Sequence, residues 1–235
     1  MSDILEELLG RQFEIARGEA EALPLPRFDT YTICNLRGGI GKTSLAFNLA
    51  YLADEILAVD TCPQCNLSWF FDNNYLQNVQ LTVYDMLLPH FVPGLGSASR
   101  IAKSIAATND FFEGKRAFYL PSDNHLYILP SQIATAMVQA QRMAGNLQES
   151  IIDAMLFSLR DDIRREMQET GTKRCIIDTS PFFSGATHLS WHACDAMIIP
   201  ARTDRQSINS LTLLIKTLSD PASEFRKIMP SNGHT

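Results

Sequence analysis

The sequence has no apolar run of the roughly 18 residues that a bilayer-spanning helix needs, and it has no excess of positive charge. Acidic residues outnumber basic ones by 26 to 20, which gives a formal net charge of −6. Nucleic-acid-binding domains are usually basic, so any contact with DNA must come from a local patch. The leading segment MSDILEELLG is acidic where a secretory signal is basic. We therefore expect a soluble, cytoplasmic protein with no membrane partner.

Cysteine is also scarce, with five in a chain that carries no export signal, so reduced thiols are expected. Cys62 and Cys65 have the C-x-x-C spacing that redox pairs and half zinc sites also use. A four-cysteine zinc site needs a second such pair, and the other cysteines do not have that spacing: Cys34, Cys175 and Cys194. Ordinary reduced thiols are the favoured interpretation, and a redox pair or half a metal site are the alternatives.

What the sequence does contain is the composition of a globular protein, with 46% apolar and 20% charged residues. Residues 1–27 predict an amphipathic helix and a proline-containing linker, ahead of a main α/β domain at residues 28–235. In that domain short apolar strands alternate with helices, which favours a mostly parallel sheet covered by helices on both faces. We expect strands at residues 31–36, 56–59, 126–129, 175–178 and 196–199. Helices are expected at residues 43–53, 81–88, 101–107, 133–143, 147–168, 185–193 and 207–218.

The segment from Tyr31 to Ser44 has the order of a strand, a glycine-rich turn and a helix start. Glycine permits close backbone approach, so the N–H groups of such a turn can point at phosphate oxygens. Lys42 can reach the β- and γ-phosphates, and the Thr43 hydroxyl can ligate Mg²⁺. The segment thus predicts a site for a nucleoside triphosphate with Mg²⁺, formed by Gly38, Gly39, Ile40, Gly41, Lys42, Thr43 and Ser44. A solvent loop that merely caps a helix would not explain three glycines and a lysine together.

Two aspartates follow apolar strands, Asp60 in ILAVD and Asp178 in CIID. In parallel sheets ligands sit beyond the carboxyl ends of the strands. An acid in this position is typical of the Walker B aspartate, which holds Mg²⁺ through its water shell. Each aspartate can alternatively cap the helix that follows. Beside the phosphate loop, Asp178 is the better candidate for the metal site.

Together these segments resemble the ParA/MinD group of deviant Walker A ATPases, a family of P-loop NTPases, and ParA partition proteins most closely. RGGIGKTSLAFNLA is similar to the first motif, the deviant form in which a basic residue, here Arg37, and two glycines precede x-G-K-T. The opening glycine of the usual G-x-x-x-x-G-K-[ST] pattern is Leu36 in this sequence. AVDTCPQCNLS resembles the family's Asp-x-Asp-Pro-Gln-Gly-Asn segment. TVYDML and LYILPSQIA resemble motifs in the middle of the family's sequence. CIIDTSP is similar to its Walker B strand, and DAMIIPA is similar to the strand that follows.

The resemblance implies an ATP- and Mg²⁺-dependent sandwich homodimer that associates with the nucleoid by binding DNA non-specifically. A ParB-like or adaptor protein would stimulate hydrolysis and release, and the resulting gradient would partition plasmids or chromosomes or position other cargo. It implies catalytic roles for Arg37, Lys42 and Asp60, with Arg37 reaching the nucleotide of the other subunit. Thr43 and Asp178 would serve the metal.

Three departures from the family pattern bear on function. Arg37 replaces the signature lysine, and a planar guanidinium differs from a compact ammonium. Cys62 replaces the second aspartate of the Asp-x-Asp pair, and a thiol with an ordinary pKa near ~8.5 is a poor substitute for a carboxylate. The family's further strand, near adenine, is not found after the predicted helix at residues 207–218. Either the sequence is truncated or the base pocket is built differently, and we favour truncation. From Cys62 we expect tight ATP binding with slow turnover.

Basic residues after the last predicted strand, Arg202 and Arg205, are candidates for the local DNA patch, with scattered solvated arginines as the alternative. Other functions remain open for the whole chain. A weakly hydrolysing ATP-dependent scaffold is credible because of Cys62. A MinD-type positioning ATPase would need a basic amphipathic C-terminal helix. A metabolic P-loop enzyme would need additional substrate residues and would turn over without DNA or a partner protein.

Overall fold

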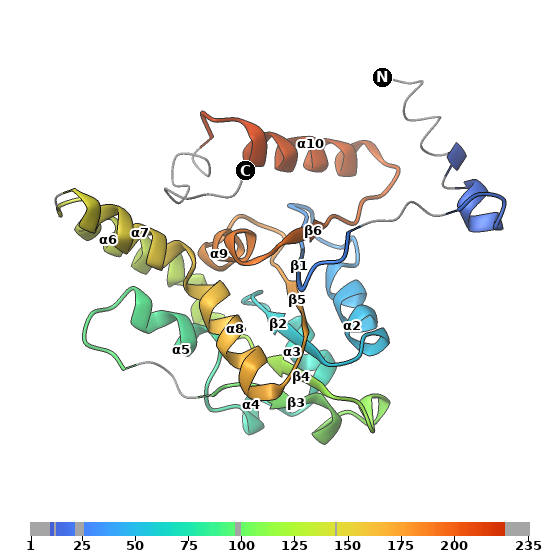
Figure 1. Ribbon diagram of the computed structural model, residues 1–235, viewed down its shortest axis with the longest axis horizontal. Helices are drawn as coiled ribbons and strands as arrows, with labels where there is room; N and C mark the ends of the chain where they lie inside the picture. Colours follow the sequence, from blue (N-terminus) through green and yellow to red (C-terminus); the bar gives the residue numbers. More distant parts are fainter. Residues whose placement is uncertain (1–9, 12, 22–25, 97–99, 144, 224–235) are drawn as a thin grey trace.

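A six-stranded sheet in the order β3-β4-β2-β5-β1-β6 forms the centre of the molecule, as the computed structural model shows (Figure 1). The structure describes residues 10–11, 13–21, 26–96, 100–143 and 145–223. The β3–β4 pair is antiparallel, and the other four pairs are parallel. The strands are β1 (Thr30–Ile33), β2 (Ile56–Asp60), β3 (Lys103–Ser104), β4 (Ala117–Leu120), β5 (Arg174–Asp178) and β6 (Ala196–Ile198). The predicted mostly parallel α/β sheet is confirmed.

One face of the sheet is covered by α2 (Lys42–Leu52) and α3 (Asn66–Phe71), with the short helices η2 (Ile105–Ala107) and η3 (Asp110–Phe112). Three phenylalanines form the centre of this layer: the ring centroid of Phe47 lies 5.5 Å from that of Phe71 and 5.6 Å from that of Phe112. Edge-to-face and offset contacts at such distances stabilise beyond simple area burial. The packing fixes α2, and hence the loop that precedes it, against the sheet.

The opposite face carries most of the remaining helices (Figure 1). Gly185 opens the helix at the centre of this layer, and a Cβ there would lie 3.2 Å from the backbone nitrogen of Pro130 and 2.8 Å from Ile133 Cδ1. Only glycine therefore allows this close packing. The elements are α5 (Val83–Leu87), η1 (Leu88–His90), η4 (Asn124–Tyr127), α6 (Leu129–Ala140), α7 (Asn146–Leu156), α8 (Ser158–Thr170) and α9 (Gly185–Ala193). The short helix α4 (Tyr75–Asn78) instead lies beside α3, where the ring centroid of Tyr75 is 4.9 Å from that of Trp69.

The helix α10 (Arg205–Ser219) lies beyond β6 at the end of the sheet and away from the two main layers (Figure 1). It packs through a small separate apolar cluster, in which Leu214 of α10 meets Cys34 and Trp191. Cys34 directly follows β1, so α10 is anchored next to the loop that joins β1 to α2. This proximity could not be inferred from the sequence.

Three expectations about the middle of the chain are corrected. Residues 126–129, expected as a strand, end η4 and begin α6, because Asp123 caps the turn through the His125 N–H and Pro130 suits a first helical turn. In this part of the chain the strand that pairs with β2 is β4, a few residues earlier in the sequence. Residues 101–107 contain β3 and η2, and the helix expected at 147–168 is divided at Phe157 into α7 and α8.

At the N-terminus, residues 10–11 and 13–17 are helical, as expected. The rest of the expected leading helix, and part of the linker, lie outside the described residues, as does the tail after residue 223. The domain boundary at residue 28 stays a prediction. Among the described residues, no helix is both long and apolar enough to cross a bilayer.

Candidate functional site

Three neighbouring parallel strands, β2, β5 and β1, bring the predicted site residues to one edge of the sheet. Asp60 and Asp178 are paired in register across β2 and β5, and Ile33 of β1 is paired with Asp178. The loop after β1 therefore begins beside the two carboxylates. This is the position at which ligands bind in open α/β sheets.

The loop between β1 and α2 takes backbone conformations that favour glycine. Gly39 has φ 71° and Gly41 has φ 89°, and Gly41 is the N-cap residue of α2. The loop borders a pocket of about 660 Å³. Its lining combines the loop with residues from the ends of β2 and β5: Gly38, Gly39, Gly41, Lys42, Thr43, Ser44, Cys62, Gln64, Asn66, Phe70, Thr179 and Pro181.

Lys42 is buried, with 7% of its surface exposed, at the first position of α2. Its Nζ donates to the carbonyl oxygens of Asn35 at 3.0 Å and Arg37 at 2.9 Å. Burial lowers the pKa of Lys42, and the nearby Asp178 acts in the opposite direction. An ammonium has three N–H donors, so one remains for an anion in the pocket that Lys42 lines.

Asp178 is fully buried, and within the described residues neither of its carboxylate oxygens has a hydrogen-bond partner at standard geometry. Burial first, and then the charge of Asp60, raise the pKa of Asp178 to about 7, while the Thr43 hydroxyl and Lys42 act to lower it. A buried carboxylate without partners is costly unless a cation compensates it. The pairing of this carboxylate with the Thr43 hydroxyl fits a hydrated Mg²⁺ ion.

We predict that Asp178→Asn stabilises the Mg²⁺-free protein by about 2–4 kcal/mol at pH 8.5 and by much less at pH 5. The folded-state pKa of about 7 lies above the usual 3.8, so Asp178 contributes a stabilising proton that is lost as pH rises through about 7. Asparagine removes this titration. Urea unfolding at both pH values measures the difference, with Asp54→Asn in an exposed turn as the control. An equal effect of Asp178→Asn at both pH values would contradict the prediction.

Asp60 is buried too, but its oxygens are occupied. They accept from the N–H of Cys62 at 3.0 Å and from the N–H and hydroxyl of Ser68 at 2.9 and 2.8 Å. The Ser68 hydroxyl accepts in turn from the Ser122 N–H, and the Ser122 hydroxyl donates to the Cys62 carbonyl at 2.6 Å. Burial raises the pKa of Asp60 to about 6, and these hydrogen bonds oppose the rise. Asp60 therefore holds the loop after β2 in place.

Cys62 lines the pocket and is 4% exposed. Burial, followed by the charge of Asp60, raises the pKa of its thiol to about 12, so it is neutral near pH 7. Cys65 is also buried, and burial raises its pKa. Neutral, buried thiols are poor nucleophiles, which disfavours the redox alternative for this pair.

Arg37 turns toward α10 in this structure. Its Nη1 donates to Asp204 and, at 2.6 Å, to the hydroxyl of Ser207. Asp204 is the N-cap of α10, where its side chain accepts the Ser207 N–H. Asn35 strengthens the same connection, since its side-chain N–H donates to the Pro200 carbonyl at 3.0 Å. Sequence reasoning did not identify Asp204, Ser207 or Asn35, because these contacts span more than 160 residues.

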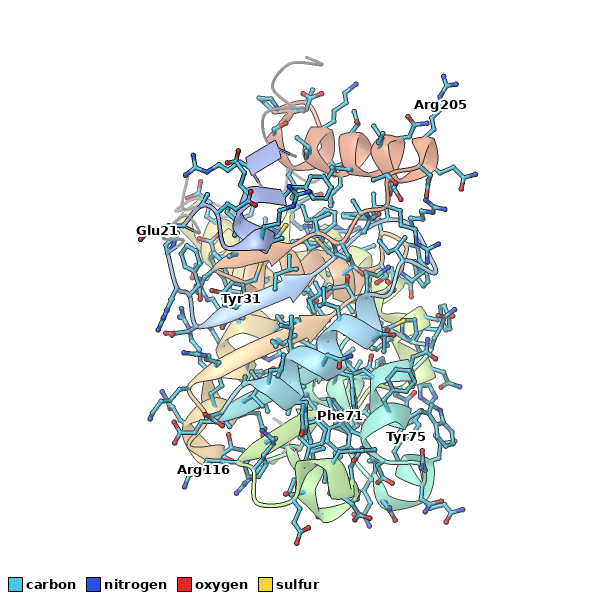
Figure 2. The ribbon with its side chains drawn as sticks, turned by 90° about the vertical axis from the view of Figure 1, so that its right-hand side faces the viewer. Glu21, Tyr31, Phe71, Tyr75, Arg116 and Arg205 are labelled. Atoms are coloured by element: carbon cyan, nitrogen blue, oxygen red, sulfur yellow. The ribbon has the colours of Figure 1, made fainter. Side chains whose placement is uncertain are left out.

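The two candidate DNA-binding arginines lie in different surroundings. Arg202 donates from Nη2 to the Gly39 carbonyl of the phosphate loop at 2.8 Å. Arg205 is exposed at the start of α10, and Figure 2 shows its side chain pointing away from the sheet. The structure thus brings Arg202 to the loop and leaves Arg205 at the surface.

Comparison with known proteins adds to this geometry. The family model AAA_31, described as an AAA domain, matches residues 29–229. The maintenance of carboxysome distribution protein A of Gloeothece citriformis (strain PCC 7424) is 27% identical over 192 residues, which cover 80% of this chain and 61% of that protein. The chain therefore spans about three fifths of the length of this curated relative.

Solved structures share the fold. An ATP complex of a Cyanothece McdA variant has a TM-score of 0.57 at 24% identity, covering 87% of this chain and 66% of that chain. The cobyrinic acid a,c-diamide synthase of Mycobacterium smegmatis, with bound ADP and magnesium, has a TM-score of 0.58 at 18% identity, covering 83% and 68%. These neighbours bind adenine nucleotides, in the second case with magnesium. With its phosphate loop, its sheet order and this match over most of its length, the chain belongs to the AAA_31 family and is a ParA-family P-loop ATPase.

Proposed function

We propose that this chain binds ATP with Mg²⁺, hydrolyses it slowly, and acts as a nucleotide-switched homodimer that positions DNA or another large cargo. The observation that carries the proposal is the buried carboxylate of Asp178, which has no hydrogen-bond partner at standard geometry among the described residues and interacts with the Thr43 hydroxyl at the phosphate loop. A site that costs stability in the empty protein is explained by the ligand that compensates it.

The nucleotide-binding roles follow from the loop geometry. N–H groups of the loop from Gly38 to Ser44 would hold the phosphates, with Lys42 adding its free donor. The Thr43 hydroxyl and Asp178 would hold Mg²⁺, which when bound neutralises phosphate charge. Asp60 acts indirectly, because its oxygens already position the segment that carries Cys62.

Slow turnover is proposed because Cys62 takes the place of a carboxylate beside the phosphates. Its neutral thiol can neither accept a proton readily nor orient water as a carboxylate does. The same observation favours the second candidate function, an ATP-dependent scaffold that scarcely hydrolyses. The likeness to a synthase keeps a metabolic P-loop enzyme as a further candidate.

The dimeric switch is proposed from Arg37 and its partners. In the single chain Arg37 is held by Asp204 and Ser207. A role on the nucleotide of a second subunit requires that this contact be exchanged for phosphate oxygens, which arginine binds well. Dimerisation would then be coupled to α10, whose N-terminus carries both acceptors. The likeness to a Gloeothece protein that maintains carboxysome distribution supports cargo positioning as the outcome.

We propose that the ATP-bound dimer binds DNA non-specifically and that a ParB-like or adaptor protein stimulates hydrolysis. Arg205 remains a candidate DNA contact because it is exposed and unobstructed at the start of α10. A MinD-type membrane role is a further alternative, although the last described helix, α10, has only two basic residues, Arg205 and Lys216.

A size and activity measurement separates these functions. With ATP and Mg²⁺ the purified chain should sediment as a dimer, and with ADP as a monomer; non-specific DNA should bind only the ATP form. ATP hydrolysis should stay below about 1 per minute without DNA or a partner, well under the typical enzyme turnover. Rapid turnover with no change in mass would support a metabolic enzyme, and dimerisation with no detectable hydrolysis would support the scaffold.

A further inference from the structure

We propose that Arg202 is a positioning residue of the phosphate loop: it orients the Gly39–Ile40 peptide so that the Ile40 N–H faces the phosphates. This inference rests on the proposed function, because it assigns a role at the same nucleotide site. It replaces the DNA-binding role expected for Arg202 from the sequence.

The contact itself joins two distant segments of the chain. Arg202 lies in the connection between β6 and α10, and its Nη2 donates to the Gly39 carbonyl at 2.8 Å across 163 positions. The donor is charged, and charge-assisted hydrogen bonds are stronger than neutral ones. A solvated DNA-contacting arginine has no need of a backbone acceptor in a glycine loop.

The geometry of a trans peptide links the Gly39 carbonyl, which Arg202 contacts, to the orientation of the Ile40 N–H. Among the described residues there is no cis peptide bond, and in a trans peptide the C=O and the following N–H point in opposite directions. Arg202 is not among the residues that line the pocket, whereas Gly38, Gly39 and Gly41 line it. The Gly39 carbonyl is thus held by a residue outside the pocket lining. If this carbonyl faces away from the pocket, the Ile40 N–H on the same trans peptide faces toward it.

The loop needs such support because glycine gives it freedom. Gly39 and Gly41 have φ of 71° and 89°, and the peptides beside glycines rotate more easily than others. A peptide that flips would present a carbonyl dipole to the phosphates in place of an N–H donor. Arg202 opposes that flip from outside, while Lys42 holds the Asn35 and Arg37 carbonyls from inside. The loop is thus preorganised for an anion from both sides.

The test compares Arg202→Ala with Arg164→Ala, which removes an exposed arginine of α8 that has no assigned role. Isothermal titration measures the Kd of ATP and ADP with Mg²⁺ and of inorganic triphosphate, on the full chain. We expect Arg202→Ala to weaken all three by about 10-fold, because each needs the N–H groups of the loop, and Arg164→Ala to change none. Arg202→Lys should restore part of the loss, since an ammonium can still donate to the Gly39 carbonyl.

Two further measurements separate this role from a general loss of structure. Thermal unfolding should be similar for Arg202→Ala and Arg164→Ala; should Arg202→Ala not fold, the same comparison is made with Arg202→Met, which keeps a long side chain but has no N–H donor. In ¹⁵N-isoleucine spectra, the Ile40 amide resonance, assigned by Ile40→Val, should shift in Arg202→Ala before any ligand is added.

The outcomes are distinct from those for the site as a whole. Unchanged affinity for all three anions in Arg202→Ala, with binding lost in Lys42→Ala, would overturn the role of Arg202 and leave the nucleotide site standing. Unchanged anion affinity with a lower salt slope of DNA binding would return Arg202 to the DNA patch and equally overturn the inference. A wild-type protein that binds no nucleotide would overturn the proposed function together with this inference.

Discussion

Replacing Lys42 with alanine is expected to weaken the binding of magnesium ATP by about 100-fold or more, which is the largest loss among the predictions. The side chain is buried in the loop and donates to two carbonyl oxygens of the loop. Alanine removes the charge that attracts the phosphates. It also leaves the carbonyls of Asn35 and Arg37 without their donor, so the loop loses both a ligand group and its internal support.

Fluorescence titration or equilibrium dialysis with ATP and Mg²⁺ measures this loss, and circular dichroism checks that the fold is kept. The matched control is Lys103→Ala, which removes an exposed lysine from β3, an edge strand of the sheet outside the site. The control should bind as the wild type does. If Lys42→Ala retained the wild-type affinity, the loop would not be the phosphate site and the assignment of ATP would fail.

Replacing Cys62 with aspartate is expected to raise the rate of ATP hydrolysis by about 10- to 100-fold. The thiol lines the pocket, and burial together with Asp60 raises its pKa to about 12, so it cannot serve as a base near pH 7. A carboxylate at this position can orient and activate water. The backbone of residue 62 is already fixed, because the Cys62 N–H donates to Asp60 and the Cys62 carbonyl accepts from Ser122.

The added carboxylate lies near Asp60 and Asp178, so its repulsion is relieved only when Mg²⁺ is bound. The gain should therefore appear at saturating Mg²⁺ and be small at low Mg²⁺. Asparagine has nearly the same shape as aspartate but no charge, so Cys62→Asn should not accelerate hydrolysis. Cys65→Ser controls for the loss of a neighbouring thiol. An aspartate variant no faster than the wild type would refute the view that Cys62 limits turnover.

Local sequence patterns were sufficient for the elements that form the site. Apolar runs ending in Asp60 and Asp178 predicted β2 and β5, and glycines before Lys42 predicted the loop and the start of α2. These features depend on a few consecutive residues, since strand burial and glycine conformation are local properties. Order along the chain then placed the two aspartates at the same edge of a parallel sheet.

Short segments in the middle of the chain were beyond such reasoning. Residues 126–129 are apolar enough for a strand, yet they join η4 to α6, whereas Ala117–Leu120 forms β4 only because it pairs with β2 and β3. A four-residue apolar run does not distinguish strand from helix, and partners distant in sequence decide.

The sequence by itself determined that this chain has a phosphate loop followed by a lysine and a threonine, two acids at strand ends, and a cysteine where a third acid is usual. Only the tertiary structure decided that, among the described residues, Asp178 is buried with no partner at standard geometry while both oxygens of Asp60 accept hydrogen bonds. It also decided that Arg37 binds Asp204 and that Arg202 donates to the Gly39 carbonyl. The physical reason is that the charge of a side chain and the conformational freedom of the backbone depend on the identity of each single residue. The burial and hydrogen-bond partners that set a side chain's role come from segments that meet only when the sheet and α10 are packed.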